Sequence, residues 1–202
     1  PLGRAIGNSL EVIEAIEFLK GNIESGDLAD LTYYFASSAL VFLDMYETRQ
    51  DAEKYLRELV RSGKALEKFR EVIVAQGGDT AVLENYDNFE LPAFKIECES
   101  KKSGYVQYIN AFNIAQASKA LGASRENSSR PIDLSVGIYL NKKSGEYVNK
   151  GENLYTIYSN DEEKTKIAQK FCDEAFSINE SKPSHVNLVY AVIGTNDEDD
   201  DV

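Results

Sequence analysis

The chain has 202 residues, of which 43% are hydrophobic, and its formal net charge at pH 7 is −12. This composition is typical of one globular domain or two small ones, and the acidic charge argues against nucleic acid and anionic membranes as partners, because both require basic patches. The strongest apolar run, residues 40–43, is far too short to cross a bilayer.

The first third of the sequence is predicted to be helical. Asn8 and Glu11 form a capping-box pattern, which predicts a helix that starts at Asn8 and ends near Gly21. Thr48 is the expected cap of a third helix, and residues 64–75 are the expected fourth. Between the first helix and Thr48, a second helix is expected over residues 28–45. Four of its apolar side chains are expected to face inward: Leu31, Phe35, Leu40 and Leu43.

The pattern changes near Pro92, where apolar and polar residues begin to alternate. The segments "AFKIECES" and "GYVQYI" predict two strands, and Asn110 caps a helix that reaches residue 121. Two more strands are expected at residues 136–140 and 154–158, then a helix over residues 161–176 capped by Asn160. The segment "HVNLVYAVI" predicts a final strand, and five acidic residues at 197–201 predict a solvated tail. The fold class is therefore α+β, a helical segment followed by a sheet-containing module.

Residues that could carry chemistry are few. His185 has no nearby serine, cysteine or acidic partner, so it is a poor catalytic candidate. Cys98 and Cys172 have neither metal-ligand spacing nor a disulfide framework, so we expect buried thiols in a reducing cytoplasm. No phosphate loop, dinucleotide fingerprint or zinc signature occurs. We therefore assign no catalytic residue and no organic cofactor.

The chain opens on "PLGRAIGN", and we call residues 1–7 the opening segment. A glycine-containing loop before a helix can present N–H groups to an anion. It can equally turn its carbonyls toward a cation if a carboxylate such as Glu14 lies close by. The alternative is that Gly3 and Gly7 only allow a tight entry into the helix and that Glu14 is solvated.

The segments "GYVQYI" and "KKSGEYVNKGENLYTIYS" are similar to the hammerhead fold of biotinyl and lipoyl carriers. A carrier presents its modified lysine at a hairpin tip, after a methionine or beside an aspartate, and neither pairing occurs here. Three lysines of this region are therefore interpreted as solvated turn residues: Lys142, Lys143 and Lys150. A scaffold use of the fold is favoured over carrier chemistry.

Five segments occur in order: "PLGRAIGNSLEVIEAIEFLKG", "SGKALEKF…AQGGD", "SGYVQYI", "PIDLSVGI" and "KKSGEYVNKGENLYTIYSND". Together they resemble the C-terminal half of the pyrimidine-nucleoside phosphorylases, the group that includes thymidine phosphorylase. The resemblance implies that residues 1–80 are the helical C-terminal part of an α/β phosphorylase domain and that residues 81–92 are a linker. Residues 93–178 would be the C-terminal α+β subdomain, a mixed or antiparallel sheet of barrel-sandwich character, and residues 179–202 a final strand and tail.

The resemblance also implies an activity: reversible phosphorolysis of uridine- or thymidine-type nucleosides to the free pyrimidine and a pentose 1-phosphate, with phosphate as co-substrate. The family's phosphate- and base-binding residues belong to an N-terminal half, so we expect this chain to be part of a larger homodimeric enzyme and to be inactive alone. The alternatives are a non-catalytic hammerhead interaction or carrier module and, more weakly, a related phosphoribosyltransferase.

The resemblance carries one site onto this chain. The family's cation ligands match the carbonyls of Leu2 and Ala5 and the side chain of Glu14, and the cation would be K⁺ or Ca²⁺. Its remaining ligands would come from a glycine-rich phosphate loop of the N-terminal half. One departure is Ser124, where many relatives have glycine; this would matter if that position required a positive φ.

Overall fold

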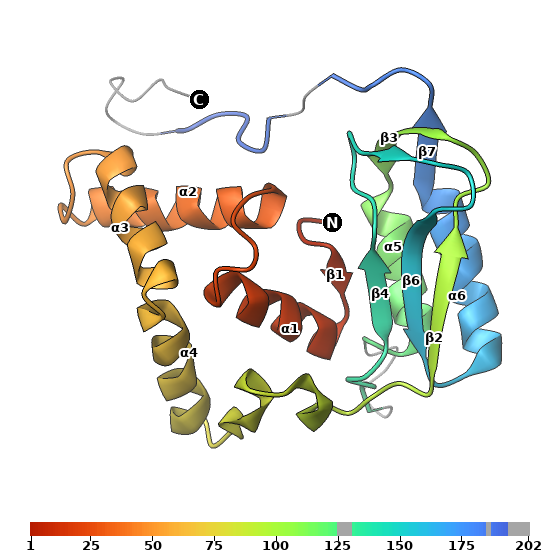
Figure 1. Ribbon diagram of the computed structural model, residues 1–202, viewed down its shortest axis with the longest axis horizontal. Coiled ribbons are helices and arrows are strands. Elements are labelled where there is room, and N and C mark those ends of the chain that lie inside the picture. Colours follow the sequence, from red (N-terminus) through yellow and green to blue (C-terminus); the bar gives the residue numbers. More distant parts are fainter. Residues whose placement is uncertain (125–130, 185–186, 194–202) are drawn as a thin grey trace.

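The computed structural model describes residues 1–124, 131–184 and 187–193. Its first part is a helical layer made of α1 (Asn8–Leu19), α2 (Asp27–Phe42), α3 (Arg49–Arg61) and α4 (Lys64–Ala75). Two 3₁₀ turns, η1 (Thr80–Leu83) and η2 (Tyr86–Asn88), lead from this layer to the sheets. Figure 1 shows the helical layer on one side, the sheets on the other, and the N-terminus between them. The four predicted helices are confirmed.

The entry into α1 differs in detail from the predicted capping box. Glu11 accepts a hydrogen bond from the backbone N–H of Gly7 at 2.9 Å, as a capping-box glutamate does. The cap itself is Gly7, and Asn8 is already helical. The Asn8 side chain instead donates to the carbonyl of Ala123 at 2.9 Å, which ties the start of α1 to the later module.

The predicted inward face of α2 is wrong in part, because Leu31 and Leu40 are half-buried but the other two predicted residues are not. Phe35 and Leu43 are exposed by 62% and 63%, whereas Ala29, Tyr33 and Ser37 are buried. The buried positions repeat every four residues, and Tyr33 precedes the exposed Phe35 by two residues, about 200° around a helix. Tyr33 packs on Phe18 of α1, with ring centroids 5.3 Å apart. This aromatic contact lies on the side of α2 that faces inward.

The later module contains two open antiparallel sheets. The first has the strand order β1-β4-β6-β2, with β1 (Ala5–Ile6), β4 (Gly137–Leu140), β6 (Asn153–Ser159) and β2 (Phe94–Glu99). The second has the order β5-β3-β7, with β5 (Tyr147–Val148), β3 (Gly104–Ile109) and β7 (Phe176–Asn179). The strand pairs within each sheet are antiparallel. Among the described residues the sheets do not close into a barrel, so the predicted barrel-sandwich character is not seen and α+β is the class that holds.

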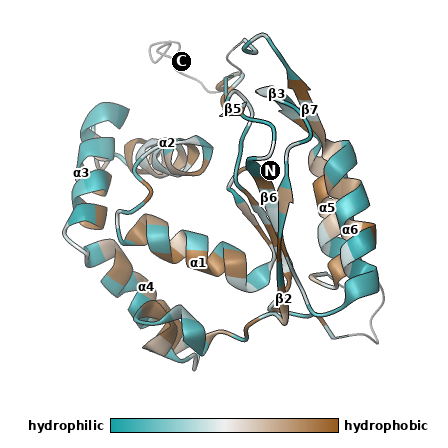
Figure 2. Cartoon of the chain, turned by 45° about the vertical axis from the view of Figure 1, so that its right-hand side comes forward, coloured by the Kyte–Doolittle hydropathy of each residue, from teal (hydrophilic) through white to brown (hydrophobic). Residues whose placement is uncertain are grey.

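The main core lies between these sheets and two helices, α5 (Ala111–Leu121) and α6 (Glu162–Ala175). The α6 residues that are buried are small, namely Thr165, Ala168, Cys172 and Ala175, and they let α6 pack closely on α5. The outer side of α6 is hydrophilic (Figure 2). Both cysteines are free and buried in this core, as expected.

Three details at the C-terminal side correct the sequence predictions. The cap of α6 is Asp161, whose side chain accepts from the N–H of Lys164, rather than Asn160. Within the described ranges the last strand is β7, directly after α6, and residues 187–193 are not a strand. Tyr190 and Ile193 are 84% and 100% exposed, and β3 already pairs with β5 and β7. His185 and the acidic tail lie outside the described residues.

Two further observations concern the backbone at Ser124 and the length of the helices. Ser124 does not require a positive φ, because Asp44 alone among the described non-glycine residues has one. The glycine-to-serine departure therefore brings no backbone strain. Within the described ranges, no helix combines the length and apolar character needed to cross a membrane.

Candidate functional site

The opening segment is an integral part of the first sheet. Its strand β1 pairs with β4, with Ala5 opposite Tyr139 and Ile6 opposite Ile138. The N–H of Leu140 donates to the carbonyl of Arg4 at 2.7 Å. A segment at the start of the chain is therefore fixed to strands about 135 residues later, and α1 follows at once on the other side.

Two glycines make this close approach feasible. A Cβ on Gly7 would lie 2.6 Å from the carbonyl oxygen of Val136, and Gly7 has a φ of 134°, which only glycine adopts readily. A Cβ on Gly137 would lie 2.4 Å from the carbonyl oxygen of Ile6. The tight-entry interpretation of Gly7 is thus confirmed, but it explains only half of the segment.

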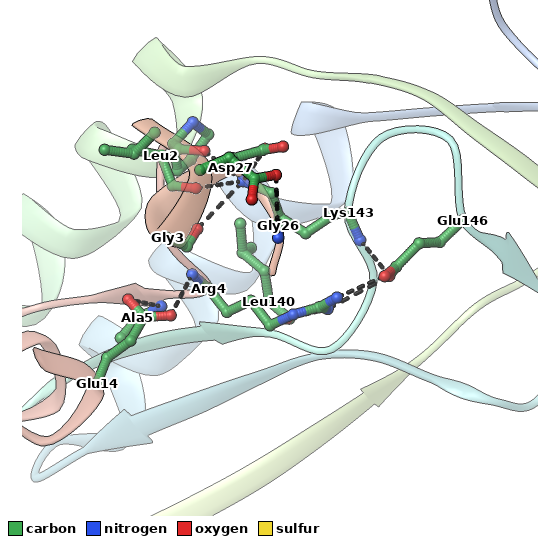
Figure 3. Close-up of polar contacts among 12 residues, drawn as sticks. Leu2, Gly3, Arg4, Ala5, Glu14, Gly26, Asp27, Leu140, Lys143 and Glu146 are labelled. Atoms are coloured by element: carbon green, nitrogen blue, oxygen red, sulfur yellow. Dashed lines mark hydrogen bonds and ion pairs between the residues drawn. The ribbon is translucent and has the colours of Figure 1, made fainter. Parts of the chain in front are cut away.

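Glu14 is not simply solvated. It projects from α1 toward the opening segment, where Oε1 accepts from the N–H of Arg4 at 2.7 Å and Oε2 accepts from the N–H of Ala5 at 3.3 Å (Figure 3). A Cβ on Gly3 would lie 2.1 Å from Oε2, so Gly3 leaves the space that this carboxylate fills. The carboxylate therefore holds the backbone of the opening segment against α1.

The three predicted cation ligands line one cleft. Leu2, Ala5 and Glu14 border a cavity of about 570 Å³ between the opening segment, α1, α2 and α5. Carbonyl and carboxylate oxygens are the donors that hard cations prefer. The carbonyl of Leu2 turns toward a positive charge, the ammonium of Lys143 at 2.9 Å. The donor chemistry fits a hard cation, while coordination of a metal ion by these residues stays a prediction.

Lys143 is the residue that sequence reasoning missed. Its ammonium contacts the carbonyls of Pro1, Leu2 and Gly3 and forms an ion pair with Asp27 at 3.1 Å (Figure 3). The side chain is only 13% exposed, so its interpretation as a solvated turn residue is wrong. No local pattern could have found it, because its partners lie more than 100 residues away and only the β1–β4 pairing brings them together.

The other two lysines behave differently from each other. Lys142 is 20% exposed and pairs with Glu152, so it too is not a free turn residue. Lys150 is exposed at the turn between β5 and β6, as expected. These lysines lie near one another in sequence, but only Lys143 reaches the opening segment.

A second ion pair fixes the same corner of the molecule. The Arg4 guanidinium binds the carboxylate of Glu146 and donates to the carbonyl of Asn141 at 3.0 Å. Burial alone would raise the pKa of Glu146, but the hydrogen bonds from Arg4 and from the backbone N–H of Lys143 outweigh it and hold this pKa below its ordinary value of 4.5. Glu146 therefore stays ionised at neutral pH and anchors the opening segment to the β4–β5 connection.

The thiols offer no nucleophile. Burial raises the pKa of both Cys98 and Cys172, and the two side chains are 5% and 0% exposed. A thiol is reactive as an exposed thiolate, so these residues act as small hydrophobic core groups. Across the described ranges, no group of three or more His, Cys, Asp or Glu side chains is arranged to hold a metal ion.

Comparisons with known proteins place the chain in a family. Residues 105–179 match the family model described as the pyrimidine nucleoside phosphorylase C-terminal domain. The chain is 40% identical over 193 residues to a pyrimidine-nucleoside phosphorylase of Staphylococcus epidermidis, an alignment that covers 96% of this chain and 44% of that protein. It is 44% identical over 170 residues to the corresponding Staphylococcus aureus protein, covering 84% of this chain and 39% of that protein.

The chain spans less than half the length of the curated relatives that it matches. The matched part of those relatives is their C-terminal part. The resemblance noted from the five sequence segments is thereby confirmed. The chain is homologous to the C-terminal part of the pyrimidine-nucleoside phosphorylases and carries their C-terminal domain.

Proposed function

We propose that this chain serves as the C-terminal portion of a pyrimidine-nucleoside phosphorylase, which catalyses reversible phosphorolysis of uridine- or thymidine-type nucleosides. The observation that carries the proposal is the 40% identity to a pyrimidine-nucleoside phosphorylase over 96% of this chain. In this reaction phosphate attacks the anomeric carbon, the pyrimidine leaves, and a pentose 1-phosphate forms. The enzyme would work in the cytoplasm as a homodimer.

The groups that bind phosphate and base would come from an N-terminal portion. A phosphate dianion requires positive charge and N–H or hydroxyl donors. The cavity that Leu2, Ala5 and Glu14 border is instead mostly apolar and carries two carboxylates, Glu11 and Glu14. These carboxylates repel a dianion, so the chain alone is expected not to catalyse phosphorolysis.

The contribution of this chain would be structural and electrostatic. The carbonyls of Leu2 and Ala5 and the carboxylate of Glu14 would hold a K⁺ or Ca²⁺ ion, together with oxygens from the N-terminal portion. The bound cation would supply fixed positive charge that holds the two portions in register. Glu14 already orients the backbone of Arg4 and Ala5, and Arg4 in turn holds Glu146.

The alternative of a carrier module has less support. A carrier lysine must be free to swing, yet Lys142 and Lys143 are both held in ion pairs. Lys150 is exposed, but its backbone N–H is bonded to Ser103, and it has neither a preceding methionine nor a neighbouring aspartate. A scaffold role within a phosphorylase accounts for all three lysines.

The experiment is a uridine and thymidine phosphorolysis assay, followed by the absorbance change on base release. The purified chain is assayed alone and after co-refolding with the N-terminal portion of the Staphylococcus epidermidis enzyme. We expect no turnover alone and turnover after recombination. Turnover by the chain alone, or none after recombination when gel filtration shows that the two portions associate, would contradict the proposal.

A further inference from the structure

The ammonium of Lys143 lies where the opening segment gathers its carbonyl oxygens. It donates to the carbonyls of Leu2 at 2.9 Å and Gly3 at 3.2 Å, and it also contacts the carbonyl of Pro1. Figure 3 shows the carbonyls of Leu2 and Gly3 directed at this nitrogen. Three consecutive carbonyls that point to one positive charge form an oxygen cage of the kind that proteins use for metal ions.

The surroundings of Lys143 balance its charge. The side chain is 13% exposed, and burial of a lone ammonium would be costly. Asp27, at the start of α2, supplies the counter-charge at 3.1 Å. An ammonium has three donors, and the carbonyls and the carboxylate provide more than enough acceptors to satisfy them. The ammonium of Lys143 is therefore fully partnered in this corner.

We propose that Lys143 acts as a tethered cation of the opening segment, which competes with a free metal ion for the carbonyl of Leu2 and selects against divalent ions. The inference rests on the cation site of the proposed function, whose ligands include Leu2. It goes further because Lys143 is not one of the proposed ligands, yet it would control which ion binds.

The competition follows from distances. A Ca²⁺ ion binds a carbonyl oxygen at about 2.3–2.6 Å, and Lys143 Nζ lies 2.9 Å from the oxygen of Leu2. Any calcium ion on that oxygen would therefore lie within about 5.5 Å of the ammonium. The repulsion scales with ionic charge, so it is twice as large for Ca²⁺ as for K⁺ at the same distance. The ammonium also occupies one of the two lone pairs of the Leu2 carbonyl oxygen, which leaves one for a metal ion.

The test measures ion affinity of the full 202-residue chain by isothermal titration calorimetry with CaCl₂ and with KCl. Lys143→Met removes the charge and keeps an unbranched side chain. We expect it to tighten Ca²⁺ binding by about tenfold or more, with a smaller gain for K⁺. Adding Glu14→Gln to this variant should abolish the gain, because the carboxylate is a proposed ligand.

The matched control is Lys142→Met. It removes the same charge from the neighbouring position, whose ammonium pairs with Glu152 instead of the opening segment. It should leave the Ca²⁺ affinity within about twofold of the original. If circular dichroism shows that Lys143→Met does not fold, Lys143→Gln replaces it, because the amide can still donate to a carbonyl.

Equal Ca²⁺ affinity in the original chain and the Lys143 variant, including no detectable binding in either, would overturn the inference. An equal gain in the Lys142 variant would also overturn it, since the effect would then be general charge. This outcome is distinguishable from failure of the proposed function. A Ca²⁺ gain without phosphorolysis after recombination would support the role of Lys143 and reject the phosphorylase.

Discussion

Replacing Gly137 by alanine should detach the opening segment from the first sheet. The new Cβ would lie 2.4 Å from the carbonyl oxygen of Ile6, 2.9 Å from Leu10 Cδ1 and 3.2 Å from the Cα of Gly7. Ordinary contacts of a Cβ begin at about 3.4 Å, so β1 must move outward by roughly an ångström. The nearest obstacle is backbone and cannot rotate away.

The expected cost is the upper part of the range for overpacking, about 2–3 kcal/mol. For a chain of this size, this corresponds to a fall of about 4–12 °C in the melting temperature. Urea unfolding followed by circular dichroism measures the stability. Hydrogen exchange of the Arg4 and Ala5 amides, which donate to Glu14, reports on the opening segment itself.

The control is Gly145→Ala. Gly145 has a φ of 86° and nothing within 4 Å of an added Cβ, so alanine there brings backbone strain of about 1 kcal/mol without a clash. Exchange at the opening segment should stay unchanged in this control. If Gly137→Ala shifts stability by less than the control and leaves that exchange unchanged, the β1–β4 contact does not hold the segment as described.

Three further predictions concern the core, pH and thiols. Ile157 is fully buried in the central strand β6, so Ile157→Ala should lower the free energy of unfolding by about 2–5 kcal/mol. A decrease below about 1 kcal/mol, measured by urea unfolding, would show that β6 is not central to the core. Glu146 has a folded pKa below 4.5, so its stabilisation is fully present above pH 4.5 and is lost as the pH falls through that folded value. Glu146→Gln should therefore flatten the acid side of the stability–pH curve, and an unchanged curve would rule out its role. Cys98 and Cys172 should react with a thiol reagent only after unfolding, and rapid reaction of either in buffer would contradict their burial.

Local signals were enough to predict most helices and strands. The helix α4 (Lys64–Ala75) and the strand β3 (Gly104–Ile109) have the predicted limits, because glycine and asparagine mark their ends. Which strands pair with each other could not be predicted from the sequence. The turn at Ser103 joins β2 and β3, yet these strands lie in different sheets, since each finds its partners far along the chain.

Other elements depended on tertiary contacts that a single sequence does not encode locally. The short strand β7 follows α6 without a turn signal and exists because β3 offers it an edge. The apolar residues after residue 186 looked more like a strand, but the described ones among them pair with none of the described strands.

The candidate site, too, could be predicted only in part. The resemblance named Leu2, Ala5 and Glu14, and the structure places all three around one cleft. It could not name Lys143, whose ammonium reaches the opening segment only because β1 pairs with β4. Residues that act through long-range pairing carry no signature at their own position.

The central claim is that this chain completes a pyrimidine-nucleoside phosphorylase. The most direct measurement is the kcat/KM for uridine phosphorolysis of a chimera in which residues 1–202 replace the matching C-terminal part of the Staphylococcus epidermidis enzyme. We predict a value within about tenfold of that enzyme. A chimera that folds, as judged by circular dichroism and gel filtration, but releases no uracil would contradict the claim.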